Sequence, residues 1–169
     1  MVQQNTAPVF PLHEAAKSGN IEEVTALLES GTRVDSEDSA GRTALHIAAL
    51  ASNERLVDLL IAKGADVNVE TNDGITPLHI AVEKGEYIIT NVLLSNGADV
   101  KVKMYDGLND GATPLHIAAI EGWEDIARLL VSFGARIHDR TICGLSPTAL
   151  AVQNGNVDVA RFLKQRGGC

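Results

Sequence analysis

The sequence predicts an all-α solenoid of five stacked repeats, in which each repeat is a helix-turn-helix unit with a hairpin loop. Three observations predict this fold class. A motif that contains a leucine recurs every 33 residues, at Leu12, Leu45 and Leu78, and returns after 37 residues at Leu115. Each motif is followed at a constant distance by a second apolar stripe that ends in glycine. Aromatic residues make up only 4% of the chain, so the core must be aliphatic and rich in alanine.

The first helix of each repeat is predicted to begin at a capping hydroxyl. In Thr76-Pro77 and Thr113-Pro114 the threonine caps the free amides of the helix, and the proline fits the first helical position because its φ is already helical. A fifth, eroded copy of the motif begins at Pro147. The sequence therefore places one short helix directly after each of these points.

Glycine is predicted to end the first helix, about nine residues after the cap. It stands at Gly19, Gly85, Gly122 and Gly155, where a left-handed conformation costs a glycine little. Ser52 occupies the same position in the second repeat. We therefore predict a positive φ at Ser52.

The second helix is predicted from an apolar stripe at helical spacing, as in Val57, Leu59 and Leu60. The residues that follow it, such as 65–74, have the composition of a projecting hairpin loop. One of these loops is four residues longer than the others, and we place Tyr105 and Leu108 in the insertion. Stacking supplies the core, so alanines should mark close contacts between helices, at Ala15, Ala16, Ala48, Ala49, Ala81, Ala118 and Ala119.

The repeated Thr-Pro-Leu-His-x-Ala core with its 33-residue period resembles the ankyrin repeat, over residues 10–169. The resemblance implies five ankyrin repeats, at about 10–41, 42–74, 75–111, 112–144 and 145–169, in one domain over 10–169 after a tail at 1–9. The polar, divergent end units lead us to expect a complete array, either as a whole protein or as a domain of a larger one. The resemblance also implies that the histidine of each motif bonds the cap threonine and nearby backbone.

These repeated histidines are His13, His46, His79 and His116, and we predict a structural role for them rather than a metal site. Equivalent residues of stacked repeats lie roughly 10 Å apart, too far to share a zinc ion with bonds of about 2.0 Å. The segment 106–117 resembles a calcium loop only at its start, since Leu108 and Ile117 stand where oxygen ligands are needed. Cys143 is expected to be an accessible loop thiol. We predict no catalytic residue, no metal and no cofactor.

In ankyrin proteins the partner contacts the hairpin tips and the concave ends of the first helices. In this sequence the resemblance maps these contact positions to Leu50, Glu83, Lys84 and Glu121, and to the candidate residues named below. Exposed aromatic and apolar residues suggest binding anchors, although they also fit loop packing, and the Trp123 ring could instead cover the second-helix stripe. The candidate partner-binding residues are Arg42, Asn72, Asp73, Ile75, Tyr105, Leu108, Asp110, Ile120, Trp123, Ile142 and Leu145.

The formal net charge of −8 disfavours nucleic acid as a partner. No apolar run is long enough for a membrane span, and the first residues lack the features of a secretory signal, so we expect a protein of the cytoplasm or nucleus. We also expect the chain to be a monomer. The leading hypothesis is a non-enzymatic interaction module that binds a protein or peptide on its concave surface. The alternative is a regulatory or substrate-recruiting subunit of an enzyme complex. An enzyme in its own right is disfavoured, because no pair of titratable residues outside the repeat framework converges by sequence logic.

Overall fold

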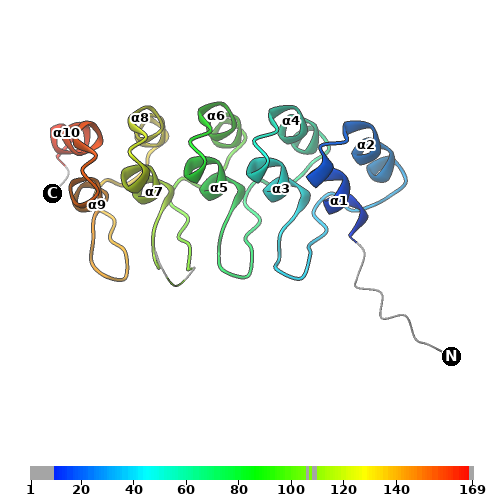
Figure 1. The fold of residues 1–169 in the computed structure, drawn as a ribbon, viewed down its shortest axis with the longest axis horizontal. Coiled ribbons are helices and arrows are strands. Elements are labelled where there is room, and N and C mark those ends of the chain that lie inside the picture. The colour runs from blue at the N-terminus through cyan, green and yellow to red at the C-terminus, as the bar shows by residue number, and fades with distance from the viewer. Residues whose placement is uncertain (1–9, 106, 108–109, 168–169) are drawn as a thin grey trace.

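The computed structural model describes residues 10–105, 107 and 110–167, and this part of the chain forms ten helices in five antiparallel pairs (Figure 1). The pairs stand side by side in one row, with the first helix of each pair in one layer and the second helix in another (Figure 1). This arrangement confirms the predicted solenoid. The first helices are α1 (Pro11–Ser18), α3 (Ala44–Leu50), α5 (Pro77–Glu83), α7 (Pro114–Glu121) and α9 (Pro147–Gln153). The second helices are α2 (Ile21–Glu29), α4 (Glu54–Ala62), α6 (Tyr87–Ser95), α8 (Glu124–Ser132) and α10 (Val157–Gln165).

The first helices begin directly after the capping residues, as predicted from the sequence. Thr76 precedes α5 and Thr113 precedes α7, each with proline at the start of the helix. The backbone amide of Thr113 donates to Nδ1 of His116 at 3.1 Å, which satisfies an amide that would otherwise be buried without a partner. The same capping box occurs at Thr43 and Thr76, so one local device sets the start of three first helices.

A left-handed residue turns the chain from the first helix to the second. Gly122 has a φ of 84°, and a Cβ atom there would lie 2.7 Å from Oδ1 of Asn156, so both conformation and space require glycine. Ser52 has a φ of 53° and is the non-glycine residue with positive φ in the described part of the chain. The prediction for Ser52 is confirmed.

The hairpin loops are joined to one another by backbone hydrogen bonds in a constant register. The amide of Asn72 donates to the carbonyl of Ala40 at 3.1 Å, and that of Tyr105 donates to Asp73 at 2.8 Å. The amide of Ile142 donates to Asp110 at 2.9 Å. Tyr105 therefore matches Asn72 and Ile142, and the four extra residues are 106–109. The expectation that Tyr105 belongs to the insertion was wrong, because sequence spacing alone does not locate an insertion within a loop.

The core is the continuous aliphatic layer between neighbouring helix pairs. The predicted contact alanines are all buried, and Ala48 and Ala118 have no exposed surface. Leucines and isoleucines of the second helices complete the layer, among them Leu60, Leu93 and Leu130, which are also fully buried. No single helix pair could bury these side chains alone, so the free energy of folding comes largely from contacts between repeats.

Candidate functional site

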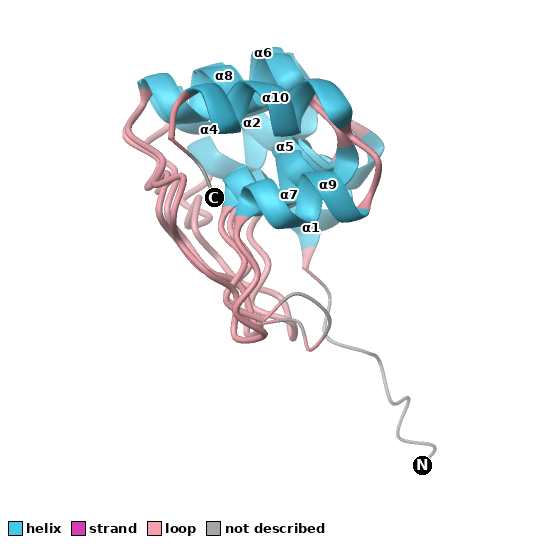
Figure 2. Cartoon of the chain, turned by 90° about the vertical axis from the view of Figure 1, so that its left-hand side faces the viewer, coloured by secondary structure: helices cyan, strands magenta, loops and turns pink. Residues whose placement is uncertain are grey.

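The hairpin loops leave one end of the first helices at an angle, so that helices and loops form two sides of an L (Figure 2). Two grooves lie on the inside of this angle. We call this the concave surface, and it contains Arg42, Ile47, Leu50, Ile75, Glu83, Met104, Ile117, Ile120 and Glu121.

The groove between α5 and α7 has an apolar floor and an acidic edge. It has a volume of about 240 Å³. Ile75 and Ile120 are half-buried, so part of each side chain remains free to contact a partner. Glu83 and Glu121 are exposed. The residues that line the groove are Ile75, His79, Glu83, Met104, Ile117, Ile120 and Glu121.

Met104 gives this groove its apolar character at a position that is polar in the other hairpins. The equivalent residues are Asp38, Thr71 and Thr141, whose side-chain oxygens accept hydrogen bonds from backbone amides of their own loops. Met104 cannot accept such a bond and is instead 7% exposed, packed beneath the hairpin. Alignment of the repeats shows this departure, although neither Met104 nor Ile117 is among the candidate residues predicted from the sequence.

The second groove lies between α1 and α3, where Arg42 is held by Asp38. Nη2 of Arg42 lies 2.7 Å from Oδ2 of Asp38. Burial pushes the pKa of Asp38 upward, but hydrogen bonds from Arg42 and Ala40 and the positive charge of Arg42 outweigh this effect and lower the pKa. Leu50, on the same groove, is 48% exposed. A partner would therefore meet an apolar side chain beside a cation that is already paired.

The other hairpin candidates lie along the row of loops. Asn72 and Asp73 are exposed, and Asn72 Nδ2 donates to the carbonyl of Ser39 at 3.2 Å. Tyr105 is 55% exposed and Ile142 is 68% exposed, so both present large apolar surfaces to solvent. The structure thus leaves these side chains accessible on the hairpins. Asp110 and Leu145 are half-buried, and Leu108 lies outside the described residues.

Trp123 lies apart from the hairpins, at the far end of the first helices. It is the N-cap residue of α8, and its ring covers Gly85, where a Cβ atom would lie 2.8 Å from the indole. The eight residues of α7 separate it from the hairpin base by about 12 Å. The structure therefore does not bring Trp123 together with the other candidates, although 38% of its surface remains exposed.

The repeated histidines of α1, α3 and α7 each connect a first helix to the next hairpin, as the resemblance implied. Nε2 of His46 lies 3.0 Å from the carbonyl of Ile75, and Nε2 of His116 lies 3.2 Å from that of Leu145. Since backbone amides donate to Nδ1 of both rings, the proton is on Nε2, which donates to the carbonyl. Burial lowers the pKa of both histidines, because it disfavours the charged ring. These imidazoles are neutral structural connectors.

Within residues 10–105, 107 and 110–167, no group of three or more His, Cys, Asp or Glu side chains could hold a metal ion. No helix in this part of the chain is long and apolar enough to cross a membrane. Cys143 is a free, exposed cysteine.

Comparison with known proteins identifies the repeat. The family model described as ankyrin repeats (3 copies) matches residues 12–104 and 102–169. Among curated proteins, no sequence matches the chain significantly. Since the two matched segments cover nearly the whole row of helix pairs, the chain belongs to the ankyrin-repeat family, whose repeats are generally protein–protein interaction modules.

Proposed function

We propose that the chain is a non-enzymatic recognition module that binds a protein or peptide segment on its concave surface, centred on the groove between α5 and α7. One observation carries this proposal. The groove combines an apolar floor with two exposed carboxylates, Glu83 and Glu121, that form no ion pair among the described residues. An apolar site with a charged edge is the arrangement that gives a binding surface both affinity and orientation.

The chemistry of the groove indicates which side chains a partner would place there. Ile75, Met104 and Ile120 favour an aliphatic chain, and the two carboxylates favour a positive charge at its end. Lysine and arginine combine these features, because their apolar stems pack while their charged heads remain near the surface. The net charge of −8 attracts a basic segment over longer distances. We therefore expect a partner segment with a lysine or arginine next to apolar residues.

A random peptide library displayed on phage tests this proposal directly. The library is selected on the intact chain, and the recovered peptides are titrated against the parent and its variants. Ile120→Ala should weaken binding by about 30-fold, the effect of losing a binding anchor of about 2 kcal/mol. The double change Glu83→Gln and Glu121→Gln should weaken binding while preserving the shape of the groove. Asp58→Ala is the matched control, since Asp58 is exposed on α4, away from the concave surface.

The composition of the peptides and the effect of the variants are read separately. Recovered peptides should be enriched in lysine or arginine beside apolar residues, and the affinity should fall with salt because exposed charges take part. Peptides that bind the parent and both concave-surface variants equally well would show that binding occurs elsewhere on the chain.

A further inference from the structure

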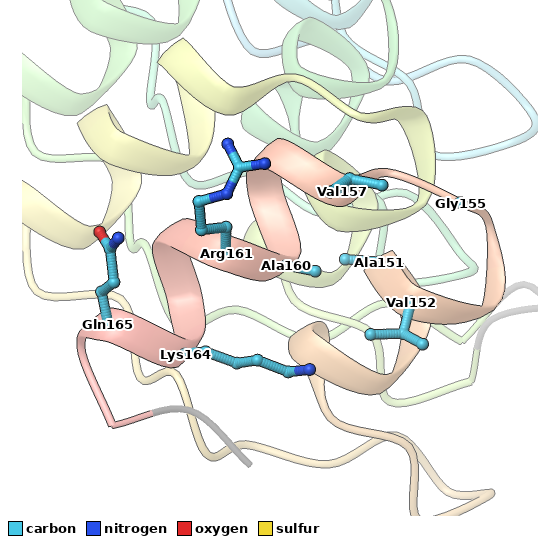
Figure 3. Close-up of a pocket in the computed structure, with 8 residues that line it drawn as sticks. All are labelled: Ala151, Val152, Gly155, Val157, Ala160, Arg161, Lys164 and Gln165. Atoms are coloured by element: carbon cyan, nitrogen blue, oxygen red, sulfur yellow. The ribbon is translucent and has the colours of Figure 1, made fainter.

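The C-terminal end of the row exposes apolar surface that the other repeats bury. A groove of about 520 Å³ lies between α9 and α10 (Figure 3). Val152 and Val157 line it and are 55% and 62% exposed. The residues equivalent to Val152 in the four preceding repeats have no exposed surface, and they are Ala16, Ala49, Val82 and Ala119. The end face is therefore a stacking surface without a neighbour among the described residues.

Contacts between the last two repeats show how such a face is covered. Asn156, at the start of α10, donates from Nδ2 to the carbonyls of Ala119 and Ile120 at 2.9 and 2.7 Å. Its amide also sits against Gly122. The guanidinium of Arg128 on α8 lies 4.4 Å from the ring centre of Phe162 on α10. A repeat thus covers its predecessor with the cap residue and one face of its second helix. At the end face, Gly155 occupies the position of Gly122, and nothing lies within 4 Å of where its Cβ would be.

The opposite end of the row carries a helix with the matching features. α2 begins after Asn20, which caps the helix as Asn53 caps α4. Leu27 on α2 is half-buried, whereas the equivalent Leu60 and Leu163 are fully buried by stacking. An interior repeat covers its predecessor with its cap residue and with apolar side chains of its second helix. The outer face of α2 has the same cap residue, Asn20, and part of that apolar surface, at Leu27. Figure 1 places α2 and α10 at opposite ends of the row.

Each end of the row has a charged residue at a position that is apolar in the other four repeats. The residue is acidic on α2 and basic on α10. Glu23 stands at a position that is apolar in the other four repeats, as Leu56, Ile89, Ile126 and Val159. Lys164 stands at another position that is apolar in the other four, as Leu28, Ile61, Leu94 and Val131. Figure 3 shows Lys164 extending from α10 along the edge of the groove toward α9. It forms no ion pair among the described residues.

We propose that a second copy of this chain stacks on the end face, head to tail, with its α1 over α9 and its α2 over α10, as neighbouring repeats pack within the chain. In the interior register, Asn20 of the second copy would cover Gly155. Glu23 of that copy would lie opposite Val159, about 7.5 Å along the helix axis from Lys164, a separation that these two long side chains can span. This contact joins two different surfaces and does not close on itself, so it produces chains that lengthen with concentration. The proposal differs from the monomer that we expect from the sequence. The end-to-end contact leaves the concave surface free to bind a partner.

Sedimentation velocity of the intact chain over a range of concentrations tests the proposal. The average mass should rise with concentration and fall again as salt is added, because the end charges are exposed. Glu23→Lys and Lys164→Glu should each weaken association by about tenfold, since each replaces an attraction by a repulsion. Glu70→Lys and Lys101→Glu make the same changes of charge on exposed residues away from both end faces, and they should leave association unchanged.

An equimolar mixture of the two end-face variants gives the sharpest result. Each variant alone brings like charges together, but in the mixture every contact between unlike chains pairs a lysine with a glutamate. Association should therefore return in the mixture, while thermal melting shows that both variants remain folded. A parent that keeps the mass of one chain at every concentration would overturn the proposal. End-face variants that associate like the parent, or a mixture that does not recover, would overturn it as well.

Discussion

Replacing Ser52 by glycine should stabilise the protein, because Ser52 holds a conformation that its Cβ atom disfavours. Its φ is 53°, in the left-handed region where a residue other than glycine costs about 1 kcal/mol. The Ser52 side chain is exposed. Its amide donates to the carbonyl of Ala49 at 3.1 Å, a bond that glycine retains. The substitution therefore removes strain without removing a structural contact.

The expected gain is smaller than the strain, because glycine also makes the unfolded chain more flexible. That entropy opposes the change by about 0.4 kcal/mol or more, which leaves a net gain of about 0.5 kcal/mol. For a chain of this length the midpoint of thermal unfolding should rise by about 1 to 2 °C. Urea unfolding followed by circular dichroism measures the same change as a higher midpoint with an unaltered slope.

Two matched variants separate backbone strain from other effects. Gly155→Ser makes the reverse change at the equivalent position, where φ is 74° and nothing lies within 4 Å of the new Cβ atom, so it should destabilise by a similar amount. Ala51→Gly lies next to Ser52 at a φ of −84° and should also destabilise. A Ser52→Gly midpoint at or below that of the parent would refute the assignment of strain to this residue.

The other predictions concern packing, pH and the insertion. Ala118→Leu should destabilise by about 1 to 3 kcal/mol, because Ala118 is fully buried between repeats, and an unchanged melting midpoint would show that the contact has room. Gly122→Ala should also lower the midpoint, since the new Cβ would meet Asn156 at 2.7 Å; a variant that melts like the parent would mean that Asn156 moves aside freely. Because burial lowers the pKa of His46 and His116 below 6.5, the unfolded chain binds the extra protons. Stability should therefore be complete above pH 6.5 and fall as the pH drops below that value, by at most about 1.4 kcal/mol per pH unit for each histidine. Urea midpoints that stay constant between pH 7.5 and pH 5 would contradict this. Deleting residues 106–109 should change the melting midpoint little, because loop length has a small effect, but should weaken peptides selected on the adjacent groove; equal affinity would separate the loop from the site.

Much of the fold could be predicted because the local chemistry of each repeat recurs. A threonine before proline starts a helix wherever it occurs, and Gly122 and Ser52 turn the chain in the same way. These features depend on residues a few positions apart, and repetition at 33 residues separates them from chance. The resemblance to a family supplied the role of the histidines, which the spacing alone did not reveal.

The candidate site was predicted less completely, because it depends on residues from neighbouring repeats. Ile75 and Ile120 were selected and do share a groove, but Met104 was missed although it forms part of the same floor. The repeat spacing places Tyr105 in the insertion, whereas its hydrogen bond to Asp73 shows that it is equivalent to Asn72.

The sequence by itself determined the class of fold, the starts and turns of the helices and the aliphatic core, since these follow from short-range chemistry repeated along the chain. Only the tertiary structure decided that Trp123 covers Gly85 rather than joining the hairpins, and that Glu83 and Glu121 flank one groove. It also decided that the groove at Val152 lies open at the end of the row. The physical reason is that stacking brings together side chains more than thirty residues apart, and the packing of adjacent repeats selects which of them meet.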